Sequence, residues 1–157
     1  MSLFDNVMII LCLIGASCFF SMSEISLAAS RKIRLRQLAD EGDTRAEKVL
    51  HLQAHPGSFF TVVQIGLNAV AIMGGIVGES AFRPYFYQFL TPWISDPWLT
   101  QVSFLLSFVL VTSAFILVAD LMPKRIAMAM PEPVALAVVG PMSICITLLR
   151  PLSLIHI

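Results

Sequence analysis

The sequence predicts an all-α integral membrane protein with three transmembrane helices, cytoplasmic juxtamembrane helices and a C-terminal helix that is interfacial or partly inserted. Composition is the first observation behind this prediction, because 57% of the 157 residues are hydrophobic and only 13% are charged, against about 25% charged residues in soluble domains. The second is the spacing of charges, which leaves apolar segments at about 4–29, 57–82 and 98–122. Each reaches the roughly 17 to 25 residues that cross a bilayer as a helix.

The first predicted span, residues 4–29, carries an acid near its end. No Lys or Arg precedes the span, so we expect it to be retained rather than cleaved as a signal peptide. Glu24 is costly inside a membrane, which predicts either a functional group or an acid that reaches the interface. Ser17, Ser21 and Glu24 share one helix face, with Ser23 beside them. This face suits either a cation site or helix packing.

Residues 31–54 are predicted to form two short amphipathic juxtamembrane helices, because their apolar residues have helical spacing that is interrupted at 41–43. The segment holds Arg31, Lys32, Arg34, Arg36, Arg45 and Lys48. By the positive-inside rule it is cytoplasmic, and the N-terminus lies outside. Tyr and Trp residues between 85 and 98 then indicate an outer interface after the second span.

The second predicted span, residues 57–82, combines amides with small residues. Gln64 and Asn68 share a face, and Gly66, Gly74 and Gly78 let a neighbouring helix approach closely. Helix packing or dimerisation is the simpler explanation for the glycines. The Asn68 amide needs a partner at membrane depth, either across a helix interface or at a bound ion, and the sequence leaves both open.

The third predicted span, residues 98–122, ends in an acid followed by a proline. Pro123 cannot donate a hydrogen bond to the carbonyl of Ala119, so Asp120 and a freed carbonyl would form a broken-helix cation site. A helix end with a charged cap is the alternative. Lys124 and Arg125 mark the cytoplasmic boundary.

The C-terminal apolar segment, residues 134–150, is too short for a confident span. Pro141 is expected to break its backbone hydrogen bonds, so we predict a helix at or partly in the inner interface. Residues 152–157, LSLIHI, match a translation of a transposase adapter used in sequencing libraries. We therefore expect them not to be natural sequence, and expect the chain to be truncated there.

The polar residues of the three spans are predicted to converge. Ser21, Glu24, Asn68 and Asp120 would form a cation site that opens to the cytoplasm. No nucleotide-binding loop or catalytic motif is present in the sequence, so no enzymatic activity is expected. The three cysteines lie in apolar segments without metal-binding spacing, and we interpret them as small buried side chains.

Three segments, FFSMSEISLAAS, TVVQIGLNAVAI and ADLMPKRIA, resemble in order and spacing the signatures of the transmembrane domain of the CNNM/CorC family of cation transporters. The resemblance covers residues 1–151 and implies a homodimer of three-span domains, followed by cytoplasmic CBS modules that this chain lacks. It implies substrate or cation binding by Ser21, Ser23, Glu24, Asn68 and Asp120, and, for a divalent metal such as Mg²⁺, ligation by Ser21, Glu24, Asn68 and Asp120.

The chain departs from the family signatures where oxygen ligands are expected. Asp120 follows Ala119 where the family has Gly-Glu, and Leu67 and Ala71 replace asparagines. Mg²⁺ needs near-octahedral oxygen coordination, whereas apolar side chains suit the methylenes of an organic diamine. The chain also resembles a bacterial branch of the family that exports polyamines. We therefore expect polyamine export across the bacterial inner membrane, with Mg²⁺ or Co²⁺ efflux and a non-transporting regulator as alternatives.

Overall fold

The described part of the protein is helical throughout. The computed structural model describes the backbone of residues 3–154 and the side chains of residues 4–149, and no strand occurs within that range. Its helices are α1 (Leu3–Ala29), α2 (Lys32–Asp40), α3 (Thr44–Ala54), α4 (Pro56–Leu90), α5 (Trp98–Phe115), the π-helix η1 (Ile116–Leu121), α6 (Met122–Ala129) and α7 (Pro131–Leu154). The predicted all-α fold class is confirmed. Residues 155–157 of the expected adapter segment lie outside the described range.

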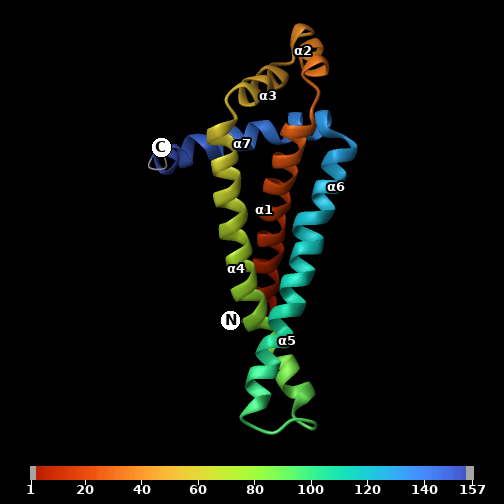
Figure 1. Cartoon of the computed structure of the whole chain (residues 1–157), viewed down its shortest axis with the longest axis vertical. Coiled ribbons are helices and arrows are strands. Elements are labelled where there is room, and N and C mark those ends of the chain that lie inside the picture. Colours follow the sequence, from red (N-terminus) through yellow and green to blue (C-terminus); the bar gives the residue numbers. More distant parts are fainter. Residues whose placement is uncertain (1–2, 155–157) are drawn as a thin grey trace.

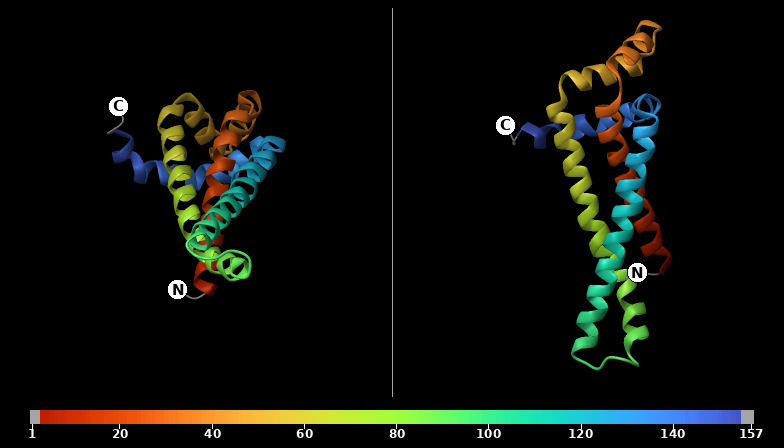
Figure 2. Two further views of the ribbon diagram at one scale, coloured as in Figure 1. Left: turned by 60° about the horizontal axis from the view of Figure 1, so that its bottom comes forward. Right: turned by 45° about the vertical axis from the view of Figure 1, so that its right-hand side comes forward.

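Four stretches of helix are long and apolar enough to cross a membrane. They are Phe4–Ala29, Pro56–Leu90, Trp98–Ala129 and Pro131–Leu149. The first three contain the predicted spans, and the protein is a multi-pass membrane protein. They differ in arrangement from the fourth: α1, α4 and the α5–η1–α6 rod run side by side, whereas α7 crosses them near one end (Figure 1). The second view of Figure 2 shows the same crosswise course.

A buried hydrophobic cluster lies where α1, α2, α3, α4 and α7 meet. Its buried side chains are Leu27, Leu35, Ala46, Val49, Phe59, Val62, Val63, Ala135, Val139 and Met142. Burying a Val, Leu, Phe or Met side chain is worth about 1.5–3 kcal/mol relative to exposure. The cluster fixes the two juxtamembrane helices and α7 to the end of the bundle, next to the C-terminus of α1.

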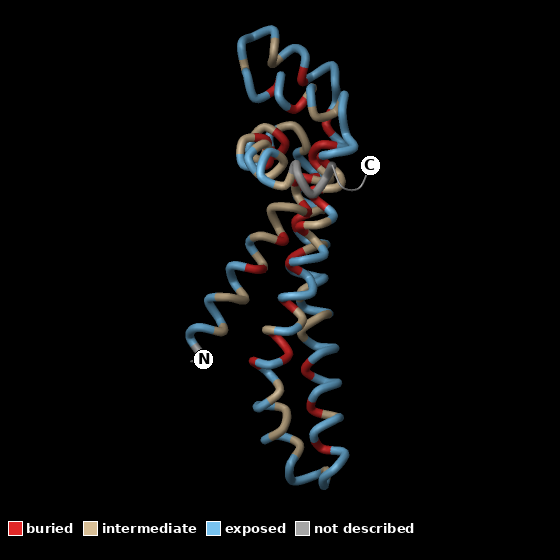
Figure 3. The backbone as a smooth tube through the Cα atoms, turned by 90° about the vertical axis from the view of Figure 1, so that its left-hand side faces the viewer, coloured by how far each residue is buried: buried red, intermediate tan, exposed pale blue. Residues whose placement is uncertain are grey.

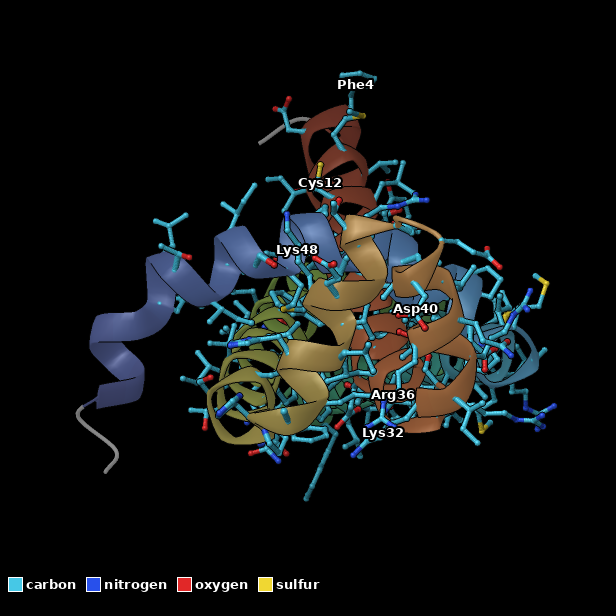
Figure 4. All side chains as sticks on the ribbon, turned by 90° about the horizontal axis from the view of Figure 1, so that it is seen from above. Phe4, Cys12, Lys32, Arg36, Asp40 and Lys48 are labelled. Carbon is cyan, nitrogen blue, oxygen red and sulfur yellow. The ribbon has the colours of Figure 1, made fainter. Side chains whose placement is uncertain are left out.

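Specific polar contacts complete this end of the bundle. The Gln53 amide Nε2 in α3 donates to the carbonyls of Leu27 (2.8 Å) and Ser30 (3.0 Å), which satisfies carbonyls that the end of α1 would otherwise leave without a donor. In the view from above, α2 and α3 cover the bundle end and carry the labelled basic residues Lys32, Arg36 and Lys48 (Figure 4).

Pro84 and Pro141 do not interrupt the helices that contain them. α4 continues through Pro84, and α7 continues through Pro141, so the prediction that Pro141 breaks its helix is wrong. A proline inside a helix removes one backbone donor, but packing of the same helix on its neighbours outweighs that loss. For α7 the packing comes from Ala135, Val139 and Met142, all of which belong to the buried cluster.

The opposite end of the molecule is more open. The N-terminal part of α1 diverges from the other two long helices (Figure 3). The α4–α5 hairpin extends further, and there the Glu79 carboxylate pairs with Arg83 one turn later. The Arg83 guanidinium lies 5.3 Å from the ring centre of Phe104 on α5, a cation–π distance that holds the two helices of the hairpin together.

Candidate functional site

Four side chains from α1, η1 and α6 meet in one charged cluster near the α2–α3 end. The Lys124 ammonium Nζ lies 3.2 Å from Glu24 Oε2 and 2.9 Å from Asp120 Oδ1. The Ser21 hydroxyl donates to the same Asp120 oxygen at 2.6 Å. One lysine therefore bridges two acids from helices that are far apart in the sequence, and a buried serine orients one of those acids.

Helix geometry explains how the sequence brings these groups together. Ser21 and Glu24 are three residues apart on α1. Asp120 and Lys124 are four residues apart on the α5–η1–α6 rod. Each pair therefore projects from one face of its helix. Asp120 belongs to η1, where the Met122 amide donates to the Leu117 carbonyl five residues earlier. Such π-helical turns are rare and concentrate at functional sites.

The helix break that the sequence predicts at Pro123 is absent, and the π-helix η1 lies directly before that proline. The α5–η1–α6 rod is continuous from Trp98 to Ala129, so it is not interrupted after Asp120. The usual conflict between a proline ring and the preceding turn is avoided because η1 is wider than an α-helix and has hydrogen bonds between residues five apart. Asp120 is thus presented from a distorted but unbroken helix.

The charges of the cluster do not balance. With both acids ionised and the lysine protonated, its net charge is one negative charge, from two carboxylates and one ammonium. All three side chains are partly shielded, with 24% of Glu24, 34% of Asp120 and 25% of Lys124 exposed. A partly buried site with excess negative charge attracts cations more strongly than the same charges would in water.

Two residues of the predicted site lie elsewhere. Ser23 is fully buried and its hydroxyl donates to the Phe19 carbonyl of its own helix at 2.7 Å. Asn68 is exposed on α4, and no hydrogen bond in the described part of the chain joins it to the cluster. The structure thus brings together Ser21, Glu24 and Asp120, with Lys124 added, and leaves Ser23 and Asn68 outside.

The glycines of α4 lie where neighbouring helices come closest. A Cβ atom on Gly66 would meet the Phe20 ring of α1 at 2.5 Å, and one on Gly74 would meet the Phe115 ring at 2.8 Å. A Cβ on Gly78 would collide with Val111 of α5. These contacts agree with a packing role for the three glycines. Pro123 is buried in the rod beside Lys124.

An apolar pocket of about 210 Å³ lies between the N-terminal half of α1, α4 and α5, further from α2 and α3 than the charged cluster is. Its wall includes Ile10, Ile14, Phe115 and Val118. Cys18 lies between the two regions, with its thiol 3.8 Å from the Val118 carbonyl. Along α1 and the α5–η1–α6 rod, going away from α2 and α3, the side chains therefore change from carboxylates and a hydroxyl to hydrocarbon.

Lys124 is the member of the cluster that the sequence interpretation treated, like Pro123, as a structural residue at the cytoplasmic boundary. Its position four residues after Asp120 was a usable signal, because acid and lysine at that spacing commonly pair on one helix. Its second partner, Glu24, was not visible in the sequence, since that contact depends on how α1 packs against α6.

Comparison with known proteins places the chain in a family. Residues 8–157 match the family described as the Cyclin M transmembrane N-terminal domain. The chain belongs to this cyclin M family. The resemblance seen in the three sequence signatures is thereby confirmed, and those signatures contain Ser21, Glu24 and Asp120 of the charged cluster.

Several curated relatives of this cyclin M domain are named as exporters. The chain is 58% identical to the polyamine export protein of Escherichia coli over 148 residues, which is 94% of this chain and 33% of that protein. It is 49% identical to the polyamine export protein of Haemophilus influenzae over 152 residues, 97% of this chain and 35% of that protein. The chain thus spans about a third of the length of these relatives.

Proposed function

We propose that this cyclin M domain is the membrane part of a polyamine exporter, and that Glu24 and Asp120 bind an ammonium group of the substrate. The observation that carries the proposal is that both carboxylates already hold a primary alkylammonium, that of Lys124, at 2.9 and 3.2 Å. A polyamine ends in the same chemical group. The site therefore has the hydrogen-bond distances that such a substrate requires.

An apolar pocket further along the same helices supports a substrate with a hydrocarbon chain. A diamine such as putrescine has methylenes between its ammonium groups, and the apolar wall of Phe115, Val118 and Ile14 offers them a surface without polar groups to desolvate. The names of the relatives from Escherichia coli and Haemophilus influenzae agree with this substrate class.

The same proposal includes an orientation in the bacterial inner membrane. Basic residues gather on α2 and α3, which favours a cytoplasmic position for that end and an outside position for the N-terminus. The crosswise course of α7 supports three spans plus an interfacial α7, with α7 on the cytoplasmic side (Figure 1). The carboxylate site would then load from the cytoplasm, as export requires.

We also propose that the domain acts as a homodimer. α4 exposes Gln64, Asn68, Ile72 and Ile76 along one side. Amide side chains at membrane depth are stabilised by hydrogen bonds across a helix interface, and a second copy of α4 or α5 would supply such an interface. In this arrangement Asn68 contributes to assembly rather than to the charged cluster.

Efflux from loaded cells tests the proposed function. Cells that produce the complete protein would be loaded with radiolabelled putrescine, and the rate of its release would be compared for wild type, Glu24→Gln and Asp120→Asn. We expect each variant to lose about tenfold or more, since a hydrogen bond to a charged group is worth about 1.5–3 kcal/mol. Glu41→Gln and Asp40→Asn, at exposed positions outside the cluster, are the matched controls and should export normally.

The second candidate substrate is a divalent cation such as Mg²⁺ or Co²⁺, because hydroxyl and carboxylate oxygens, the ligands that Mg²⁺ prefers, gather at Ser21, Glu24 and Asp120. Efflux of ²⁸Mg²⁺ or Co²⁺ but not of putrescine, lost in the same two variants, would replace the polyamine proposal with this one. If the complete protein reaches the membrane at normal levels and cells release neither putrescine nor the divalent cations, a regulatory role of the domain would be favoured instead.

A further inference from the structure

Lys124 has a position that its place at the end of a membrane-spanning rod does not require. Arg125, the next residue, is exposed, whereas the Lys124 ammonium turns back to contact Glu24 on another helix and Asp120 on its own. A lysine that only marked a membrane boundary would gain most by reaching water or lipid headgroups. Lys124 instead occupies the position between the two acids.

We propose that Lys124 is a tethered competitor of the substrate: its ammonium fills the carboxylate pair in the empty transporter, leaves when a substrate ammonium enters, and returns after release. This inference rests on the proposed function, because it takes Glu24 and Asp120 as the substrate site. It goes beyond that function by giving the lysine a role in affinity and in the return of the empty site.

The chemistry of the two ammonium groups makes them alternatives. Lysine ends in a primary ammonium on four methylenes, and putrescine consists of two primary ammonium groups joined by four methylenes. Both present the same donors to the same oxygens, Oε2 of Glu24 and Oδ1 of Asp120, so they cannot occupy the site together. Binding of one therefore reduces the occupancy of the other.

The structure allows Lys124 to leave without collapse of the site. Its side chain is 25% exposed and ends in a compact ammonium on a flexible stem. Asp120 would still accept the hydrogen bond from the buried Ser21 hydroxyl at 2.6 Å, which keeps the carboxylate oriented. Displacement would cost an ion pair, and the entering substrate ammonium would supply the same positive charge to the same two carboxylate oxygens.

Return of Lys124 after release would serve the empty transporter. Two neighbouring carboxylates without a counterion are unfavourable in a low-dielectric surrounding. The Lys124 ammonium is attached to the same protein, so it supplies that counterion without having to diffuse in from solution. Removal of Lys124 should then have opposite effects on two quantities. Substrate should bind more tightly, because competition is gone, and turnover should fall, because release is no longer assisted.

Binding and transport by the complete protein test this inference. Equilibrium binding of putrescine would be measured in detergent, and KM and kcat in proteoliposomes, for wild type, Lys124→Gln and Lys124→Arg. If Lys124 fills the site nine-tenths of the time, its removal raises putrescine affinity about tenfold. We expect Lys124→Gln to bind about tenfold tighter with a lower KM and a lower kcat, and Lys124→Arg to stay close to wild type because it keeps a competing cation.

Arg125→Gln is the matched control, since it removes the same charge one residue further on and leaves the cluster intact. It should change affinity less than twofold, which separates competition from a general effect of charge. Chemical rescue guards against a folding artefact. In a background without the native cysteines, Lys124→Cys should bind tightly, and modification with an aminoethyl thiosulfonate, which restores an ammonium on a tether of similar length, should return the affinity to the wild-type value.

The outcomes separate this inference from the function on which it rests. If Lys124→Gln binds putrescine no tighter than wild type while Glu24→Gln abolishes binding, the tethered-competitor role is excluded and the polyamine site stands. If Arg125→Gln tightens binding as much as Lys124→Gln does, charge alone is responsible and the inference also fails. If wild type and every variant fail to bind putrescine, the proposed function fails and this inference falls with it.

Discussion

At the scale of single residues, the charged cluster depends on a serine as well as on its ions. The Ser21 hydroxyl is fully buried and donates to Asp120 Oδ1, the same oxygen that Lys124 contacts. A hydroxyl in this position stabilises the ionised carboxylate and fixes its rotamer. Ser26, another buried serine of α1, instead donates to the carbonyl of Ser23 at 3.3 Å. The two serines are therefore a matched pair for testing the site.

Ser21→Ala is expected to weaken putrescine binding by about tenfold, because one hydrogen bond to a charged group, worth about 1.5 kcal/mol at the low end of the usual range, is lost. Ser26→Ala should bind within about twofold of wild type. The measurement is equilibrium binding of putrescine to the complete protein in detergent. Equal affinities for the two variants would show that Ser21 does not orient a binding carboxylate.

Single residues also show how far the sequence alone could lead. The sequence predicts Glu24 and Asp120 because a carboxylate in an apolar segment is costly and calls for a function, and it predicts Ser21 because that serine shares a helix face with Glu24. The helical period assigns residues to a face of their own helix, but it does not tell which neighbour that face meets. For this reason Asn68 was expected at the site and lies on an exposed face of α4, while Lys124 was expected at the boundary and lies in the site.

At the scale of helices, a local sequence rule explains where α3 begins. Asp43 caps α3, with Oδ1 accepting from the Arg45 amide at 2.9 Å, while the Arg45 guanidinium donates to both carboxylate oxygens. The side-chain hydrogen bond from Arg45, followed by the bond from its amide, lowers the pKa of Asp43. Gly42, with a φ of 96°, forms the turn before this cap, in a conformation that glycine adopts without strain.

The lowered pKa of Asp43 predicts a pH dependence for α3. A carboxyl group with a lower pKa in the folded state stabilises the fold above its unfolded pKa, and that contribution is lost as the pH falls through the folded pKa. Acidification should therefore reduce the amide-exchange protection of Ala46 and Glu47 in wild type. Asp43→Asn keeps a capping oxygen that does not titrate, so its protection should depend less on pH. Parallel acid profiles for the two proteins would contradict this account of the cap.

The glycines of α4 make a second prediction for the elements. Gly78→Ala should lower the stability of the helix bundle by about 1–3 kcal/mol, the usual cost of overpacking, because the new methyl group meets the branched Val111 of α5. Gly15→Ala is the matched control, as no atom lies within 4 Å of its added Cβ. The midpoint of thermal unfolding in detergent is the measurement. A midpoint for Gly78→Ala equal to that of Gly15→Ala would argue against close α4–α5 packing.

The limits of sequence-based prediction are clearest for whole helices that contain proline. Helix positions followed from apolar run lengths, and each of the first three expected spans falls inside a helix. The helix interruptions that the sequence predicts at Pro123 and Pro141 are absent from the structure, because the rule for proline considers one helix in isolation. Around Asp120 the chain adopts a π-helix, and α7 is held by the buried cluster that it shares with α1, α3 and α4.

At the scale of the whole molecule, the two ends of the bundle differ, because the buried hydrophobic cluster lies at one end and the N-terminal part of α1 diverges from the bundle toward the other. The basic α2 and α3 and the crosswise α7 lie toward one end, where α1 and α6 also end, and the α4–α5 hairpin lies at the other (Figure 1). Glu24 belongs to the last two turns of α1, and Lys124 belongs to α6. This polarity is what an export site loaded from one side of a membrane requires. It also makes the topology directly testable.

Reporter fusions test the proposed topology. Alkaline phosphatase, which is active only outside the cytoplasm, should be active when fused after Ser95 in the α4–α5 hairpin. Green fluorescent protein, which fluoresces only inside, should be bright when fused after residue 154, because an interfacial α7 does not cross the membrane. A dark green fluorescent protein and an active phosphatase at residue 154 would mean that α7 is a fourth span.

The most direct test of the central claim is the equilibrium binding of putrescine to the purified complete protein, with Mg²⁺ measured in parallel, for wild type and Asp120→Asn. The account predicts that wild type binds putrescine and that Asp120→Asn binds it about tenfold or more weakly, since this substitution removes the charge on the oxygen that Ser21 and Lys124 contact. Unchanged putrescine affinity in Asp120→Asn, or binding of Mg²⁺ without binding of putrescine, would contradict it.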